Sequence, residues 1–146
     1  MSGTREELPF FVYGTLRPGE PNHDRFLLGR TSAETPAALA RARLYDGPGY
    51  PYAVLDASVS DTVTGEVAWA APGEYGELLA VLDHLEEYIA PGHPRNLYER
   101  VAHDVVRPDG TAVRAWVYVA APRVATRLRT DGVLIRGGDW SGRLSR

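Results

Sequence analysis

Residues 8–16 read LPFFVYGTL, and this stretch decides the expected fold. The compact apolar run from Leu8 to Val12 ends at Tyr13-Gly14, which predicts a buried first strand. The loop that follows, residues 14–21, holds two prolines and two glycines. Glycine at the bend allows successive backbone N–H groups to face one way, where they bind a carboxylate or stabilise an oxyanion. A plain turn after an edge strand is the structural alternative.

Outward from this loop, the sequence predicts short strands, turns and one helix. Asn22 or Asp24 is a candidate cap for a short helix that runs to about Leu28. Strands are expected, in chain order, over Ala37–Tyr45 (an imperfect pattern), Tyr52–Leu55, Val63–Trp69, Tyr98–Val106 and Thr111–Val119, with turns at Asp46–Gly49 and Arg107–Gly110. The period changes to that of a helix over Glu74–Tyr88, and a proline-containing loop, Ile89–Asn96, follows. From Pro122 the tail is polar, without a recognisable element.

These elements favour an α+β fold with a mostly antiparallel sheet. The 146 residues suit a single domain, 1–146, in which residues 1–7 and about 137–146 are expected to be loosely ordered. No linker or internal repeat divides the chain. We expect a monomer or a weak homodimer.

Composition excludes several classes of function. The chain has 44% hydrophobic and 24% charged residues, the balance of a soluble globular protein. No cysteine is present, so disulfides, thiolate metal sites and cysteine nucleophiles are excluded, and a cytoplasmic protein is expected. The arginines are spread along the chain with acids between them, so no basic stripe indicates nucleic acid. No apolar run approaches the roughly 20 residues of a membrane span. No histidine pair has ligand spacing, so no metal is expected.

One carboxylate of the predicted helix points toward apolar neighbours. At about 100° per residue, Leu78, Leu82, Leu85 and Ile89 form one stripe, and Glu86 falls inside this apolar sector. Glu87 points to roughly the opposite side. Burial raises the pKa of a carboxyl group, as a general acid or base near neutral pH requires. The alternative is that Glu86 lies at the helix edge and pairs with an arginine such as Arg100.

Three motifs in order carry a resemblance to a known family. FVYGTLRPGEPNH near the N-terminus, LDHLEEY some sixty residues later, and then YERV resemble the gamma-glutamylcyclotransferase-like superfamily, in particular its gamma-glutamylamine cyclotransferase branch and related bacterial and plant proteins. The resemblance covers most of residues 8–120. It implies a small barrel of antiparallel and parallel strands flanked by helices. This chain has Glu87 where many relatives have glycine, and its loop over Ile89–Asn96 is longer than in compact members.

The resemblance also implies an activity and a site. The family reaction converts a γ-glutamyl amine or γ-glutamyl amino acid to 5-oxoproline and a free amine, without a cofactor. Glu86 would be the catalytic acid/base, and the residues expected to bind the small-molecule substrate are Tyr13, Gly14, Thr15, Leu16, Tyr98 and Tyr118. A non-catalytic module that binds a small ligand in the same pocket is the rival hypothesis.

Overall fold

The computed structural model describes residues 7–140, and in this range five strands close into a barrel. The strands are β1 (Phe10–Val12), β2 (Thr31–Ala40), β5 (Thr62–Ala70), β6 (Tyr98–Val106) and β7 (Ala112–Ala120), in the order β1-β5-β2-β6-β7. β7 pairs with β1 in parallel, and the other neighbours are antiparallel. The predicted α+β fold with a small mixed, mostly antiparallel barrel is therefore confirmed.

A glycine among the inward-facing residues of β5 lets this strand pack closely against β1. Val63 and Val67 are fully buried, as their spacing predicts for one face of a strand. Gly65 lies between them, and a Cβ built on it would stand 2.2 Å from the carbonyl oxygen of Val12. Only glycine therefore lets β1 approach β5 this closely.

The stretch Ala37–Tyr45 is extended, as predicted, but it belongs to two sheets. β2 begins earlier, at Thr31, and ends at Ala40, whereas β3 (Ala42–Tyr45) pairs with β4 (Tyr52–Leu55) outside the barrel. Arg41 between them has φ 55°, a left-handed conformation that turns the chain out of the barrel sheet. Strand propensity does not reveal this single-residue break.

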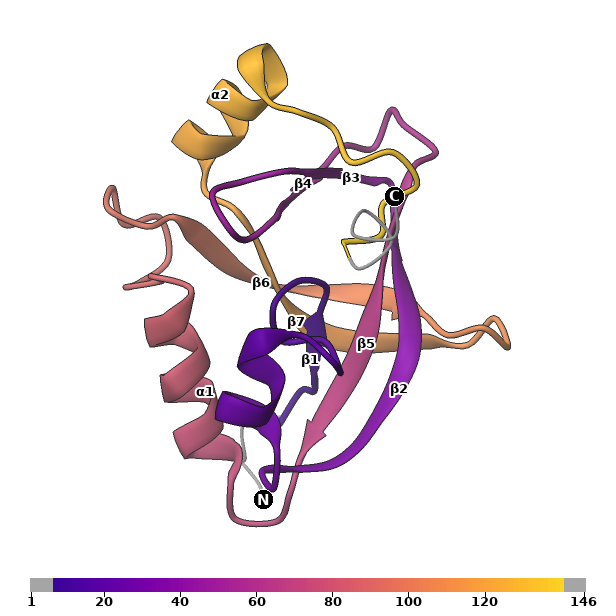
Figure 1. Ribbon diagram of the computed structural model, residues 1–146, viewed down its shortest axis with the longest axis vertical. Coiled ribbons are helices and arrows are strands. Elements are labelled where there is room, and N and C mark those ends of the chain that lie inside the picture. Colours follow the sequence, from indigo (N-terminus) through magenta and orange to yellow (C-terminus); the bar gives the residue numbers. More distant parts are fainter. Residues whose placement is uncertain (1–6, 141–146) are drawn as a thin grey trace.

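Three helical elements flank the strands. η1 (His23–Leu27) is a short π-helical turn at the predicted place, and α1 (Tyr75–Leu85) lies along one side of the barrel (Figure 1). α1 ends three residues before the predicted boundary, so Ile89 is not part of its apolar stripe and is 57% exposed. Its buried residues are Leu78 and Leu82.

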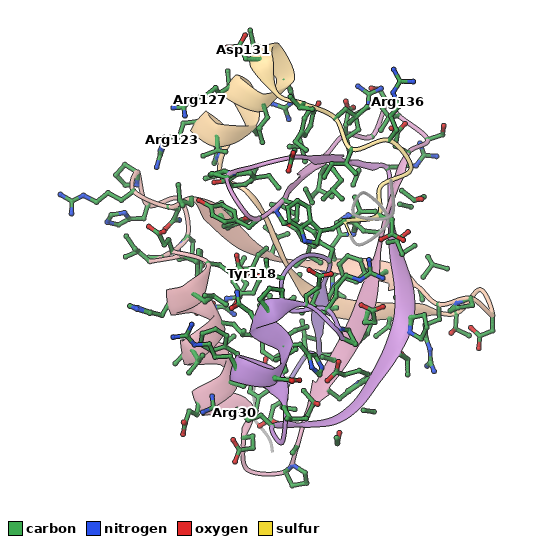
Figure 2. The ribbon with its side chains drawn as sticks, viewed as in Figure 1. Arg30, Tyr118, Arg123, Arg127, Asp131 and Arg136 are labelled. Carbon is green, nitrogen blue, oxygen red and sulfur yellow. The ribbon has the colours of Figure 1, made fainter. Side chains whose placement is uncertain are left out.

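The polar tail contains a helix that the sequence analysis missed. α2 (Pro122–Asp131) starts with proline in its first turn and lies at the end of the molecule occupied by β3 and β4 (Figure 1). Arg127 and Asp131 project outward from it (Figure 2), whereas the Arg123 guanidinium donates to the carbonyls of Pro94 and Asn96 at 3.2 and 3.3 Å. Only Val124 and Ala125 of α2 are buried, so its apolar face is too short to produce a visible period.

The segment after α2 returns to the barrel. Ile135 and Trp140 are buried, and the N–H of Thr64 in β5 donates to the carbonyl of Gly138 at 2.8 Å. Residues 137–140, expected to be loose, therefore pack against β5. The rest of the two expected loose segments, residues 1–6 and 141–146, lies outside the described residues.

Candidate active site

A pocket opens where the loop after β1 meets the end of α1 and the tyrosines of β6 and β7. Its volume is about 380 Å³ including the mouth. All the residues predicted from the sequence line it: Tyr13, Gly14, Thr15, Leu16, Glu86, Tyr98 and Tyr118. Tyr118 lies near the middle of the molecule, beside the loop that follows β1 (Figure 2). The structure thus brings the predicted residues together, and their chemical roles stay predictions.

Two further residues of the pocket wall, Tyr50 and Pro51, come from the turn between β3 and β4. Pro51 explains the need for glycine at position 14, because a Cβ there would stand 2.7 Å from the Pro51 Cδ. Gly14 does not have a positive φ. The glycine is therefore required by close packing rather than by unusual backbone freedom, which corrects the reason given by the sequence analysis.

The loop from Gly14 to Leu16 lines the pocket and is held by hydrogen bonds of its own. The N–H of Arg17 donates to the Gly14 carbonyl at 3.1 Å, and Asn22 bonds Thr15 through both its backbone N–H (2.9 Å) and its side-chain amide (2.8 Å). These bonds hold the loop in a turn. Within residues 7–140, the N–H groups of Thr15 and Leu16 have no protein acceptor. Such fixed, unused donors suit a carboxylate or an oxyanion.

Arg17 anchors this loop, a role the sequence analysis did not recognise. Its guanidinium donates to both carboxylate oxygens of Glu66 in β5, at 2.9 and 3.1 Å, and to Asp139 at 2.6 Å. The Arg17 side chain is only 11% exposed. Fork-shaped, charge-assisted bonds of this kind fix geometry. The loop is therefore tied to the barrel and to the returning C-terminal segment.

Glu86 is the first residue after α1, and its N–H still bonds the Leu82 carbonyl at 2.9 Å. The residue is partly buried, and in the described part of the chain its carboxylate has no hydrogen bond or ion pair. Desolvation by burial raises the pKa of the Glu86 carboxyl group from 4.5 to about 7. The group is therefore close to half-protonated at neutral pH.

The alternative pairing of Glu86 with Arg100 is not formed. The Arg100 Nε lies 3.0 Å from the Oδ1 of Asp83 instead. Its guanidinium also stacks over Trp116 at 4.4 Å and Tyr88 at 5.1 Å from the ring centres. Arg100 pairs with Asp83, so the Glu86 carboxylate has no cationic partner among residues 7–140.

The hydroxyl groups of three buried tyrosines are bonded to protein groups. Tyr118 donates to Asp83 Oδ1 at 2.6 Å, and Tyr98 donates to the Pro51 carbonyl at 2.6 Å. Tyr13 donates to the Tyr118 carbonyl and accepts from the Ala53 N–H at 3.1 Å. Burial raises the pKa of all three phenols, so they remain neutral. They form a rigid polar wall around Glu86.

A second hollow, of about 430 Å³ including its mouth, adjoins the pocket and is also lined by Glu86. We call the first the inner pocket and the second the outer hollow. Thr15, Tyr50, Glu86 and Tyr98 line both. Glu87 lines the outer hollow, so it does not point away from Glu86 as the helical projection predicted. The reason is that α1 has ended, and Glu87 has φ 53°.

In residues 7–140, no group of three or more histidine and acidic side chains is placed to hold a metal ion. Within the same residues, no helix has the length and apolar character needed to cross a membrane.

Comparisons with known proteins agree with this geometry. The family model described as gamma-glutamyl cyclotransferase, AIG2-like, matches residues 10–142. The gamma-L-glutamyl-butirosin B gamma-glutamyl cyclotransferase of Niallia circulans is 37% identical over 130 residues, which are 89% of this chain and 73% of the relative.

Solved structures show the same architecture. An AIG2-like protein from mouse superimposes with a TM-score of 0.61 at 26% identity, over 78% of this chain and 77% of that one. A protein from Arabidopsis thaliana superimposes with a TM-score of 0.65 at 28% identity, over 99% and 78%. The motifs, the closed barrel and these matches together establish that the chain belongs to the gamma-glutamyl cyclotransferase, AIG2-like family.

Proposed function

We propose that this protein converts a γ-glutamyl amine or γ-glutamyl amino acid to 5-oxoproline and a free amine. One observation carries the proposal: Glu86, whose carboxyl group has a pKa near 7 and no partner within residues 7–140, shares a pocket with Thr15 and Leu16, whose N–H groups have no acceptor in the same range. An acid/base group and fixed anion donors are what this reaction asks of a protein.

In the proposed mechanism the substrate supplies its own nucleophile. The Glu86 carboxylate takes a proton from the α-ammonium, and the freed amine attacks the γ-carbonyl carbon. The new N–C bond closes the five-membered ring, and protonated Glu86 gives its proton to the leaving nitrogen as the old C–N bond breaks. The regenerated carboxylate then takes the second proton from the ring nitrogen, which leaves the lactam N–H, and passes it to the released amine. Because both reacting groups belong to one molecule, the protein gains rate chiefly by folding the glutamyl chain.

The loop after β1 would hold the charged end of the glutamyl group. The N–H groups of Thr15 and Leu16 are the candidate donors, and the bonds of Arg17 to Glu66 and Asp139 keep them in place. Preorganised donors need little rearrangement when the substrate binds. No step requires a cofactor.

The name of the Niallia circulans relative supports the class of substrate. It describes removal of a γ-glutamyl group from butirosin B. We extend to this chain only the γ-glutamyl group, because the leaving group lies beyond the reacting atoms.

The test is release of 5-oxoproline. The purified protein is incubated with γ-glutamyl amines, γ-glutamyl dipeptides and glutathione, and 5-oxoproline is measured by mass spectrometry. At least one compound should be turned over by the wild type and not by Glu86→Gln. If none is turned over but γ-glutamyl compounds bind with 1:1 stoichiometry, the chain is a binding module and the enzymatic proposal is wrong.

A further inference from the structure

The outer hollow is the place where a leaving group would lie. Glu86 lines both cavities, so a γ-glutamyl group in the inner pocket directs its amide nitrogen across Glu86 toward the outer hollow. The proton that Glu86 returns must reach this nitrogen. Residues specific to the outer hollow therefore meet only the part of the substrate that is released.

Glu87 is the unusual residue of the outer hollow. Among residues 7–140, only Arg41 and Glu87 adopt a positive φ without being glycine, and the Glu87 value is 53°. Its backbone is held on both sides, because its N–H bonds the His84 carbonyl at 3.1 Å and its own carbonyl accepts from Leu97 at 3.2 Å. Glycine would fit this conformation without strain. Because Glu87 occupies a backbone conformation that favours glycine, its side chain is a candidate for a role in the outer hollow.

The chemistry of the outer hollow defines what it would accept. Leu85, Leu97 and Tyr50 supply apolar wall, and Asn22 supplies an amide. Glu87 is exposed, and in the described residues its carboxylate has no ion-pair partner. No basic side chain of the described range lines this hollow. An aliphatic group that ends in a cation complements such a surface, whereas a carboxylate would face a like charge.

We propose that Glu87 selects substrates whose leaving group is an amine carrying a second, positively charged nitrogen. The proposal rests on the proposed function and refines it. Leaving groups that are amino acids, with a free carboxylate, are disfavoured by the same residue. Glu87 acts on specificity alone, since the proton transfers belong to Glu86.

Three γ-glutamyl probes of similar length test this selection. γ-Glutamyl-1,4-diaminobutane ends in an ammonium, γ-glutamyl-n-pentylamine in a methyl group, and γ-glutamyl-4-aminobutyrate in a carboxylate. kcat/KM is measured for each with the wild type, Glu87→Gln and the control Glu77→Gln. Glu77 is 68% exposed in the first turn of α1 and lines neither cavity, so the control removes an equal charge elsewhere.

The wild type should turn over the cationic probe best. Glu87→Gln should lower the ratio of cationic to neutral kcat/KM by up to about five-fold, the upper end of the range for an exposed ion pair, mostly through KM. Glu77→Gln should keep the wild-type ratio, and high salt should reduce it in the wild type. A ratio equal in wild type and Glu87→Gln would overturn the proposal.

Failure of the proposed function would look different. If the wild type releases no 5-oxoproline from any probe, the enzymatic assignment is wrong, and calorimetric binding of the same three probes then decides the role of Glu87. Tighter binding of the cationic probe that is lost in Glu87→Gln would still support selection by this residue. Equal affinities of both proteins for all three probes would refute it.

Discussion

Replacing Glu86 by glutamine removes the proton carrier and keeps almost the same shape. The pKa of the buried group is raised from 4.5 to about 7. At 1.36 kcal/mol per pH unit, the folded state loses about 3 kcal/mol when Glu86 must be ionised, an upper value for a partly buried group. Since the folded pKa is raised, the loss is absent below pH 4.5 and complete above about pH 7.

Glu86→Gln should therefore stabilise the protein at pH 8 and change it little at pH 5. A gain of up to about 3 kcal/mol corresponds to roughly 6–12 °C in Tm for a chain of this size. Thermal unfolding at the two pH values measures the difference. The same variant should lose about 10²- to 10⁴-fold in kcat, the usual contribution of a general acid/base.

The control is again Glu77→Gln, because Glu77 is exposed on α1 and lines neither cavity. It should retain turnover and show no such pH-dependent gain in Tm. A structural role for Glu86 predicts the opposite pattern for Glu86→Gln: a lower Tm at pH 8 with near-normal release of 5-oxoproline. That result would refute both the catalytic assignment and the reasoning from burial.

Four further outcomes are expected. The kcat/KM of the wild type should rise as pH increases through about 7, because the Glu86 base must lose its proton first; a flat profile from pH 5.5 to 8.5 would contradict this. Gly14→Ala should lower stability by roughly 1–3 kcal/mol and raise KM, since its Cβ would collide with Pro51; urea unfolding and steady-state kinetics measure both. Glu87→Gly should raise stability by about 1 kcal/mol in the same unfolding assay, by relieving the positive φ. Chelation by EDTA should leave turnover of a dialysed preparation intact, and recovery on adding a divalent ion after a loss would disprove the mechanism.

Features that depend on neighbours in the sequence were predictable. The buried first strand, the hairpin of β6 and β7 and most of α1 follow from periodicity and turn residues. The prediction that Glu86 is an acid/base candidate also rested on a local signal, its position among the leucines of the predicted helix. That projection was imperfect, because α1 ends at Leu85 and the chain turns at Glu87.

Other features had no local signal. The break at Arg41 is a change in one residue's backbone conformation, and the helix from Pro122 has too few buried residues to show a periodic pattern. The bonds of Arg17 join residues 49 and 122 positions apart in the chain. The contact between Gly14 and Pro51 is likewise a product of the fold. The only local signal for the anchoring role of Arg17 is that it is an arginine within the loop after the first strand.

The amino-acid sequence by itself determined the strand pattern, the three ordered motifs and the identity of the candidate acid/base, because periodicity and motif spacing are properties of the chain. Only the tertiary structure decided that Arg100 pairs with Asp83 rather than with Glu86. It likewise decided that the pKa of Glu86 is raised and that Glu87 faces a second hollow. Desolvation, charge pairing and cavity shape depend on groups that are distant in sequence and become neighbours only when the barrel closes.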